Sequence, residues 1–243
     1  AQTGPTPFSH ELVALSESTA ECPRLMTVAS AAAVDMIRDH RQKMLMPPEQ
    51  VAELDAQWGP VSVYTGPILK TRRRVYIRLI RRLLDKGLVR LSRTYKCEVG
   101  VFTVKKKNGD QRLILDCRKA HRRFLPPPGV GLLTAEGLGR IETTDGDDLN
   151  CYEQVFARFA VGITDVENCL PRFKLGEDGV EEDLSQYFAL PFVYAYELGI
   201  SSLGGCPVEP DEKLYPLSTS IPMGWAWSLF FAQESNHTRM TMM

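Results

Sequence analysis

The chain has 243 residues, of which 44% are hydrophobic and 24% are charged, a composition typical of a globular protein with its own core. No apolar run approaches the ~20 residues of a membrane span, and no signal-peptide pattern opens the chain. These features exclude an integral membrane protein and favour an intracellular one, with no membrane partner and with its six cysteines reduced. Residue 1 is Ala rather than Met, so we expect a fragment.

The charge is segregated along the chain. The net charge is −1, yet residues 70–123 carry 19 Lys and Arg against four acidic residues. A basic block in an otherwise acidic chain is typical of a phosphate-binding surface, although a solvated arginine-rich helix face is the alternative. The candidate nucleic-acid-binding residues are Arg72, Arg73, Arg74, Arg78, Arg81, Arg82, Lys105 and Lys107.

Residues 1–70 are predicted to be a helical N-terminal extension. Residues 25–46 are rich in Ala and Met and predict a helix that ends at Pro47-Pro48. A second helix is predicted from about residue 49 to residue 58, ending at Gly59. Because no chemistry is visible here, we interpret these helices as packing elements.

A basic helix is predicted next, over residues 71–86. Its apolar residues recur at helical spacing with arginines between them. Gly87 is a natural stop for this helix, and Leu88 can supply the apolar contact that accompanies such an end.

A β-hairpin follows, with strands over 99–104 and 112–115. Asn108-Gly109 predicts a primed two-residue turn, because such turns need positive φ at both central residues. Lys105–Lys107 and Arg112 lie on the two arms, and such a pair can close over a triphosphate, Lys as a point charge and Arg as a fork. The alternative for the lysines is a solvated hairpin tip.

After a connection over 130–158, an apolar strand over 159–164 is predicted to lead into Asp165. Its carboxylate and the backbone carbonyl of Val166 are suitable Mg²⁺ ligands, since Mg²⁺ prefers oxygen ligands. A helix N-cap is the alternative role for Asp165. Further along, 176–186 is predicted as a surface loop or short helix, 187–193 as a strand and 194–213 as an irregular insertion.

The segment Pro222-Met223-Gly224 precedes an aromatic-rich helix that is predicted over 225–233. Glycine at this place lets the backbone approach a base or sugar closely. A plain helix start with a buried aromatic face is the alternative, and the two interpretations are compatible.

In this order, the segments over about 75–236 resemble those of reverse transcriptases of retroelements. The pattern Lys-Lys-x-Asn-Gly-x-x-Arg-x-x-x-Asp-x-Arg over 105–118 is similar to their fingers hairpin. The resemblance implies an α+β polymerase right hand, with fingers over 71–150 and a truncated palm over 151–243. It also implies an RNA template, a DNA primer and deoxynucleoside triphosphates as partners, with Mg²⁺ as cofactor. The implied catalytic and metal residue is Asp165, with Val166 as a metal ligand, and the implied nucleotide-binding residues are Lys106, Arg112, Leu170, Met223 and Gly224.

The sequence departs from the pattern of that family at three places. Leu170 stands where the family usually has Phe or Tyr, and Met223 stands where it usually has Gln. The Tyr-x-Asp-Asp hairpin would follow residue 233, but the sequence ends ten residues later, so we expect this chain to be catalytically incomplete by itself.

Two alternatives stay open. The first is a non-enzymatic RNA-binding or scaffolding module descended from the same fold. The second is an unrelated basic RNA-binding protein, which leaves the segments at Asp165 and Pro222 unexplained.

Overall fold

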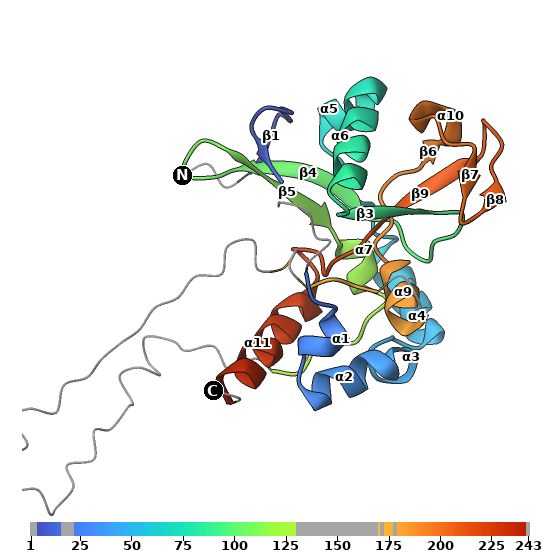
Figure 1. Ribbon diagram of the computed structural model, residues 1–243. Coiled ribbons are helices and arrows are strands. Elements are labelled where there is room, and N and C mark those ends of the chain that lie inside the picture. Colours follow the sequence, from blue (N-terminus) through green and yellow to red (C-terminus); the bar gives the residue numbers. More distant parts are fainter. Residues whose placement is uncertain (1–3, 16–21, 130–169, 171–172, 177–178, 242–243) are drawn as a thin grey trace, which may run out of the picture. The chain divides into compact units, whose positions relative to one another are not determined.

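The computed structural model describes residues 4–15, 22–129, 170, 173–176 and 179–241, with side chains described up to residue 236. The chain divides into two compact units, Ala1–Pro128 with Asn168–Met243, and Gly129–Glu167. All elements described below belong to the first unit, which is a mixed α+β structure (Figure 1). Within the described ranges, no helix is both long and apolar enough to cross a bilayer.

A four-stranded sheet is built around the predicted hairpin, which is confirmed. Strands β4 (Gly100–Lys105) and β5 (Gln111–Asp116) pair antiparallel from Gly100↔Asp116 to Lys105↔Gln111. Strand β1 (Pro5–Thr6) adds antiparallel to β4, and strand β2 (Val13–Ala14) adds parallel to β5, giving the order β1-β4-β5-β2. The prediction of a helical N-terminus is therefore wrong at its start. The free backbone groups at both hairpin edges draw this segment into the sheet.

The tip of the hairpin differs from the predicted primed turn. The Lys106 N–H donates to the Asp110 carbonyl at 2.7 Å, and the Gly109 N–H donates to the Lys106 carbonyl at 3.1 Å. This is a three-residue loop, in which the four-residue turn 106–109 ends at Gly109 with φ of 96°. The Asn108 side chain accepts a hydrogen bond from the Asp110 N–H at 3.2 Å, which stabilises this turn over the two-residue one.

The basic helix is confirmed as α6 (Arg73–Asp85), after the short helix α5 (Pro67–Thr71). At its end the Gly87 N–H donates to the Leu84 carbonyl, the Leu88 N–H donates to the Leu83 carbonyl, and Gly87 has φ of 66°. This pair of hydrogen bonds is a Schellman end, so the predicted stop at Gly87 is confirmed.

A second, three-stranded antiparallel sheet follows α6 in the order β3-β9-β6. It consists of β3 (Val89–Ser92), β9 (Lys213–Ser218) and β6 (Val193–Tyr194). The predicted strand over 187–193 is mostly wrong, because only Ala189 makes bridges, to Glu98 and Leu217, before β6 begins. The insertion after β6 is regular in part, with α10 (Ala195–Leu198) and a small hairpin of β7 (Ser202–Leu203) and β8 (Cys206–Pro207).

Where one helix was predicted over 25–46, the structure has α1 (Leu25–Val28), α2 (Ala31–Arg38) and α3 (His40–Lys43). The break before α2 has a local cause, since the Ser30 hydroxyl accepts from the Ala33 N–H at 3.2 Å as an N-cap. The next helix, α4 (Pro48–Trp58), ends at Gly59 as predicted.

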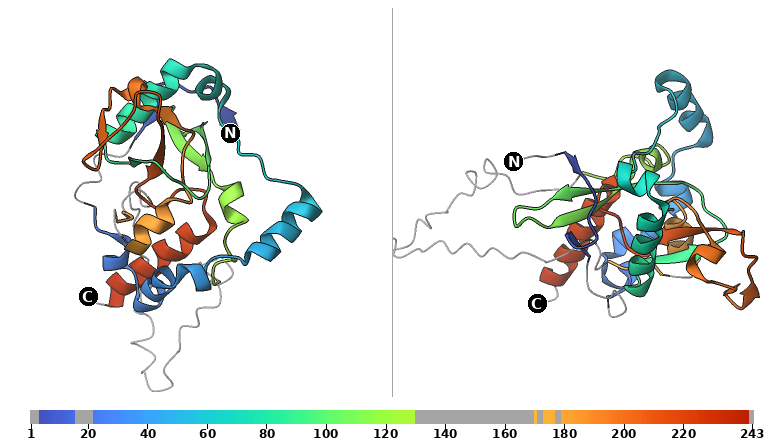
Figure 2. Two further views of the ribbon diagram at one scale, coloured as in Figure 1. Left: turned by 90° about the vertical axis from the view of Figure 1, so that its right-hand side faces the viewer. Right: turned by 90° about the horizontal axis from the view of Figure 1, so that it is seen from above.

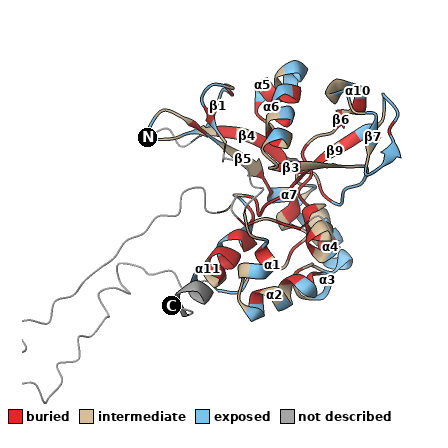
Figure 3. Cartoon of the chain, in the orientation of Figure 1, coloured by how far each residue is buried: buried red, intermediate tan, exposed pale blue. Residues whose placement is uncertain are grey.

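Two hydrophobic cores support these elements. One packs aromatic residues of α11 (Ala226–Thr241) against α1, α2, α7 (Arg118–His121) and α9 (Gly179–Ser185). The other packs α6 against the hairpin and the second sheet. Buried residues accordingly line the inner sides of α6 and α11 (Figure 3).

Helix α9 was predicted as a surface loop or short helix, and the surface part of that prediction is wrong. Glu181 is fully buried, and its carboxylate accepts hydrogen bonds from Arg24 Nε at 2.8 Å, the Met26 N–H at 3.2 Å and the Gly176 N–H at 3.1 Å. A buried carboxylate needs such partners, and two of them, Arg24 and Met26, lie far away in sequence.

Candidate nucleotide-binding face of the hairpin

The hairpin has two unlike faces, because side chains alternate across a strand. Val101 and Leu113 pack into the core that contains α6. Phe102 and Ile114, which are paired opposite each other, line a cavity on the other face. The face that carries Phe102 and Ile114, which we call the hairpin face, is therefore directed away from α6.

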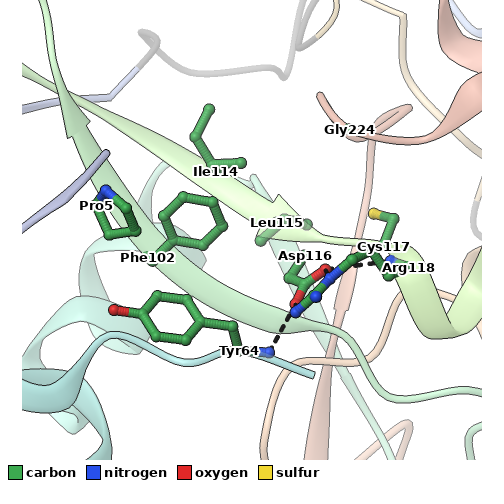
Figure 4. Close-up of a pocket in the computed structure, with 9 residues that line it drawn as sticks. All are labelled: Pro5, Tyr64, Phe102, Ile114, Leu115, Asp116, Cys117, Arg118 and Gly224. Carbon is green, nitrogen blue, oxygen red and sulfur yellow. Dashed lines mark hydrogen bonds and ion pairs between the residues drawn. The ribbon is translucent and has the colours of Figure 1, made fainter. Parts of the chain in front are cut away.

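The cavity has a volume of about 520 Å³. Figure 4 shows Tyr64 and Phe102 at its apolar end, with Asp116 and Arg118 at its polar end. The Tyr64 and Phe102 rings meet edge to face with centroids 5.4 Å apart. The lining residues are Pro5, Tyr64, Phe102, Ile114, Leu115, Asp116, Cys117, Arg118 and Gly224.

The polar end is organised by Asp116, which is 7% exposed. Its carboxylate accepts from Arg118 Nε at 2.8 Å, Arg118 Nη2 at 2.6 Å and the Tyr64 N–H at 2.6 Å. Burial raises the pKa of Asp116, but the hydrogen bonds from Arg118 and Tyr64 outweigh burial, so the net pKa is lowered. Asp116 is therefore ionised and holds the exposed Arg118 guanidinium in one orientation. Sequence patterns give Asp116 no visible partner from outside the hairpin, so its bond to Tyr64 was missed.

Gly224 brings the Pro222-Met223-Gly224 segment to this cavity. It has φ of 111°, and a Cβ at this position would lie 2.7 Å from the Leu115 carbonyl oxygen. Glycine is thus required by both the backbone conformation and the space. In the structure Gly224 closely approaches the end of β5, and its approach to a base or sugar stays a prediction. Met223 beside it is half-buried.

His121 fixes the helix that follows. Its Nε2 accepts a hydrogen bond from the Ala226 N–H at 3.1 Å, at the start of α11. Burial lowers the pKa of His121, which keeps the ring neutral and able to accept. No sequence signal had assigned this role to His121.

Arg112 lies on the hairpin face, opposite Val104, and its side chain is exposed. Lys106, half-buried, is at the loop end of the same hairpin. No acidic side chain pairs with either cation in the part of the chain that the structure describes. Lys105 is opposite Gln111 and so belongs to the other face, and Lys107 is exposed at the tip.

The remaining predicted palm residues fall in two groups. Asp165 and Val166 lie outside the described residues. Leu170 is half-buried and packs against the aromatic core. Among the residues that can be described, no group of three or more His, Cys, Asp or Glu side chains is placed to hold a metal ion.

The six arginines of the basic helix and the residue before it have unequal surroundings. Arg73 pairs with the Glu197 carboxylate, Arg81 donates to the Glu197 carbonyl, and Arg82 donates to the His10 carbonyl. Arg72, Arg74 and Arg78 are exposed. Because α6 packs on the Val101 side of the hairpin, these arginines and the hairpin face form two separate surfaces.

The sequence matches no protein-family model and no curated protein. The geometry of the hairpin face and its cavity is therefore the basis for any functional assignment.

Proposed function

We propose that this chain is part of an RNA-directed DNA polymerase similar to the reverse transcriptases of retroelements, and that it binds a deoxynucleoside triphosphate and template–primer. One observation carries the proposal. Arg112 and the cavity share one face of the hairpin, and Gly224, from a segment far along the chain, also lines the cavity.

The chemistry of this face suits a nucleotide. A free guanidinium is a bidentate phosphate ligand, and Arg112 has no acidic partner among the described side chains. The cavity of about 520 Å³ is within the range of small-molecule sites. Its Tyr64 and Phe102 end offers apolar contact to a sugar or base, while Arg112 and Lys106 neutralise the phosphates.

Mg²⁺ is part of this proposal through the family resemblance alone, with Asp165 and the Val166 carbonyl as its ligands. When bound, it would stabilise charge on the phosphates and activate the primer hydroxyl. The described residues contribute binding and orientation: Arg112 holds phosphate, and Asp116 fixes Arg118 at the cavity.

The test is calorimetric titration of the protein with a deoxynucleoside triphosphate. Arg112→Gln should weaken binding by about tenfold or more, because hydrogen bonds to charged groups contribute ~1.5–3 kcal/mol. Lys105→Gln is the matched control, since it removes the same charge from the opposite face of the same hairpin. Equal losses in both variants, or no loss in Arg112→Gln, would sink the proposal.

A non-enzymatic nucleic-acid-binding module of the same fold is the second candidate. The observation in its favour is Leu170, which packs against the aromatic core at the place where the family usually has a sugar-contacting ring. Such a module would bind RNA in a parallel titration but would show no triphosphate binding that depends on Arg112.

A further inference from the structure

We propose that a second surface, formed by α6 and α10, binds single-stranded nucleic acid by holding phosphates on arginines and stacking a base on Tyr196. The choice of nucleic acid as ligand rests on the proposed function. The location of this surface does not rest on the proposed function, because it lies on the side of α6 that is directed away from the core shared with the hairpin. We call it the α6–α10 surface, and it consists of Arg73, Arg74, Ile77, Arg78, Arg81, Glu197, Tyr194 and Tyr196.

The phosphate-binding part is a hollow of about 520 Å³ lined by four arginines, Ile77 and Glu197. Arg74, Arg78 and Arg81 are spaced by one helical turn each, so their side chains form one stripe. Arg74 and Arg78 are exposed, with no acidic partner in the described ranges. Helix α10 lies beside α6 in both Figure 1 and Figure 2, and the Arg81 Nη2 donates to the Glu197 carbonyl at 2.6 Å.

Glu197 is the one acid that lines this hollow, and it is already neutralised. Its carboxylate accepts from Arg73 Nε at 2.6 Å and from the Tyr194 N–H at 2.8 Å. Burial raises the pKa of Glu197, but these hydrogen bonds lower it further than burial raises it. Arg73 and Glu197 therefore cancel, and the positive charge of the other three arginines is left for a ligand.

The stacking part is a ladder of aromatic rings next to the hollow. Tyr194 and Tyr196 are stacked with centroids 5.6 Å apart and an interplanar angle of 14°. Tyr196 is 61% exposed, so its outer surface is available. The Arg73 Cζ lies over the Tyr194 ring, 6.0 Å from its centroid, so the ladder lies beside the arginine hollow.

A cationic hollow beside an exposed aromatic ring is the arrangement that binds single strands without sequence preference. A duplex would contact the arginines but would keep its bases away from Tyr196. The loop next to Tyr196 carries Glu209 and Asp211, and the Pro210 carbonyl accepts from the Tyr196 N–H. We therefore expect the phosphates on the α6 side of the ring, away from these acids.

The test is fluorescence anisotropy with a labelled single-stranded oligonucleotide and with the same strand annealed to its complement. The protein should bind the single strand more tightly than the duplex. Tyr196→Ala should weaken single-strand binding by about fivefold or more, which is the effect of losing one stacked base, and Tyr196→Phe should restore it. Tyr95→Ala is the matched control, because Tyr95 is also exposed and its ring contacts that of Tyr215, with centroids 4.3 Å apart and an interplanar angle of 37°.

The charge part of the inference has its own readout. Arg78→Gln should reduce the salt dependence of log K for the single strand by about 0.7, as expected for one lost phosphate contact. Arg38→Gln, at an exposed position of α2, should leave that slope unchanged. Unchanged affinity in Tyr196→Ala, an equal loss in Tyr95→Ala, or an unchanged slope in Arg78→Gln would overturn the inference.

The two proposals can fail independently. Arg112→Gln should leave oligonucleotide binding to the α6–α10 surface intact, and Tyr196→Ala should leave triphosphate binding intact. If the protein shows no triphosphate binding that depends on Arg112, the proposed polymerase function is overturned and the α6–α10 surface is not affected. If single-strand binding does not depend on Tyr196, the α6–α10 surface is overturned and the proposed function is not affected.

Discussion

The hairpin face and the α6–α10 surface both present arginines to solvent, but the carboxylate that neutralises one of them is local in one region and distant in the other: Asp116 lies two residues from Arg118, whereas Glu197 lies 124 residues from Arg73. On the hairpin face, the Asp116 carboxylate forms an ion pair with Arg118, and Arg112 has no acidic partner among the described side chains. On α6, Arg73 forms an ion pair with the Glu197 carboxylate, and Arg74 and Arg78 are exposed without an acidic partner in the described ranges. In each region one carboxylate fixes one arginine, and neighbouring cations are exposed. Clustered positive charge in a sequence therefore overstates the number of cations that a ligand can use.

The largest expected effect is a loss of stability that should impair the hairpin face but not the α6–α10 surface. Gly224→Ala should lower the free energy of unfolding by about 2–4 kcal/mol, because Ala is strained at positive φ and its Cβ would overlap the Leu115 carbonyl. Urea denaturation measures this loss. Triphosphate binding should fall with it, while oligonucleotide binding by folded protein should persist.

Gly109→Ala is the control for that variant. Gly109 also has a positive φ, of 96°, but a Cβ there would meet nothing within 4 Å. Gly109→Ala should lower the free energy of unfolding by about 1–2 kcal/mol from backbone strain alone. Equal losses in the two glycine variants would show that the contact between Gly224 and β5 contributes nothing.

A smaller effect concerns Asp116, whose lowered pKa ties stability to pH. The folded-state pKa lies below the ordinary value of 3.8, so the contribution is fully present above that value. It is lost as pH falls through the folded pKa. Asp116→Asn should remove about 1–2 kcal/mol at neutral pH, a modest loss because Arg118 is 62% exposed.

Unfolding measured from pH 7 down to pH 3 checks the sign. The difference between wild-type protein and Asp116→Asn should shrink toward the acid end. A difference that is constant across this range would mean that the carboxylate charge is not what stabilises the cavity.

The smallest expected effect is a gain. Glu197→Gln removes the acid that neutralises Arg73, so the α6–α10 surface would gain one usable cation. Single-strand affinity should rise about two- to fivefold at low salt, with a steeper salt dependence. Triphosphate affinity at the hairpin face should not change. A fall in single-strand affinity would indicate that Glu197 is needed to position α10 rather than to neutralise Arg73.

Elements that depend on neighbouring residues were predictable from the sequence. The hairpin follows from β-branched runs around Asn108-Gly109, and the end of α6 follows from Gly87 and Leu88. Both depend on residues within a few positions of each other. The break between α1 and α2 depends on one cap at Ser30, which the Ala-rich pattern conceals.

Features that depend on distant residues were not predictable. Glu181 stands in an acidic run that indicates a surface, and only the folded chain brings Arg24 to it. The cavity likewise needs Tyr64, Asp116 and Gly224 from three separate segments. Tyr194 and Tyr196 lie in a segment with no periodic pattern in the sequence. Only the folded chain places Arg73 over the Tyr194 ring, so the link between the ladder and the arginines was not predictable.

The N-terminal strands also have a consequence for the order of folding. Thr6 bonds to Thr103, a residue 97 positions later, whereas the hairpin closes through residues that are nearly adjacent. Local closure is fast and distant pairing is slow, so β4 and β5 should form before β1 and β2 join them. During synthesis on the ribosome, residues 4–15 emerge before the hairpin and have no partner in this sheet until the hairpin has been made. A segment translated before the hairpin thus acquires its native neighbours after the hairpin has formed.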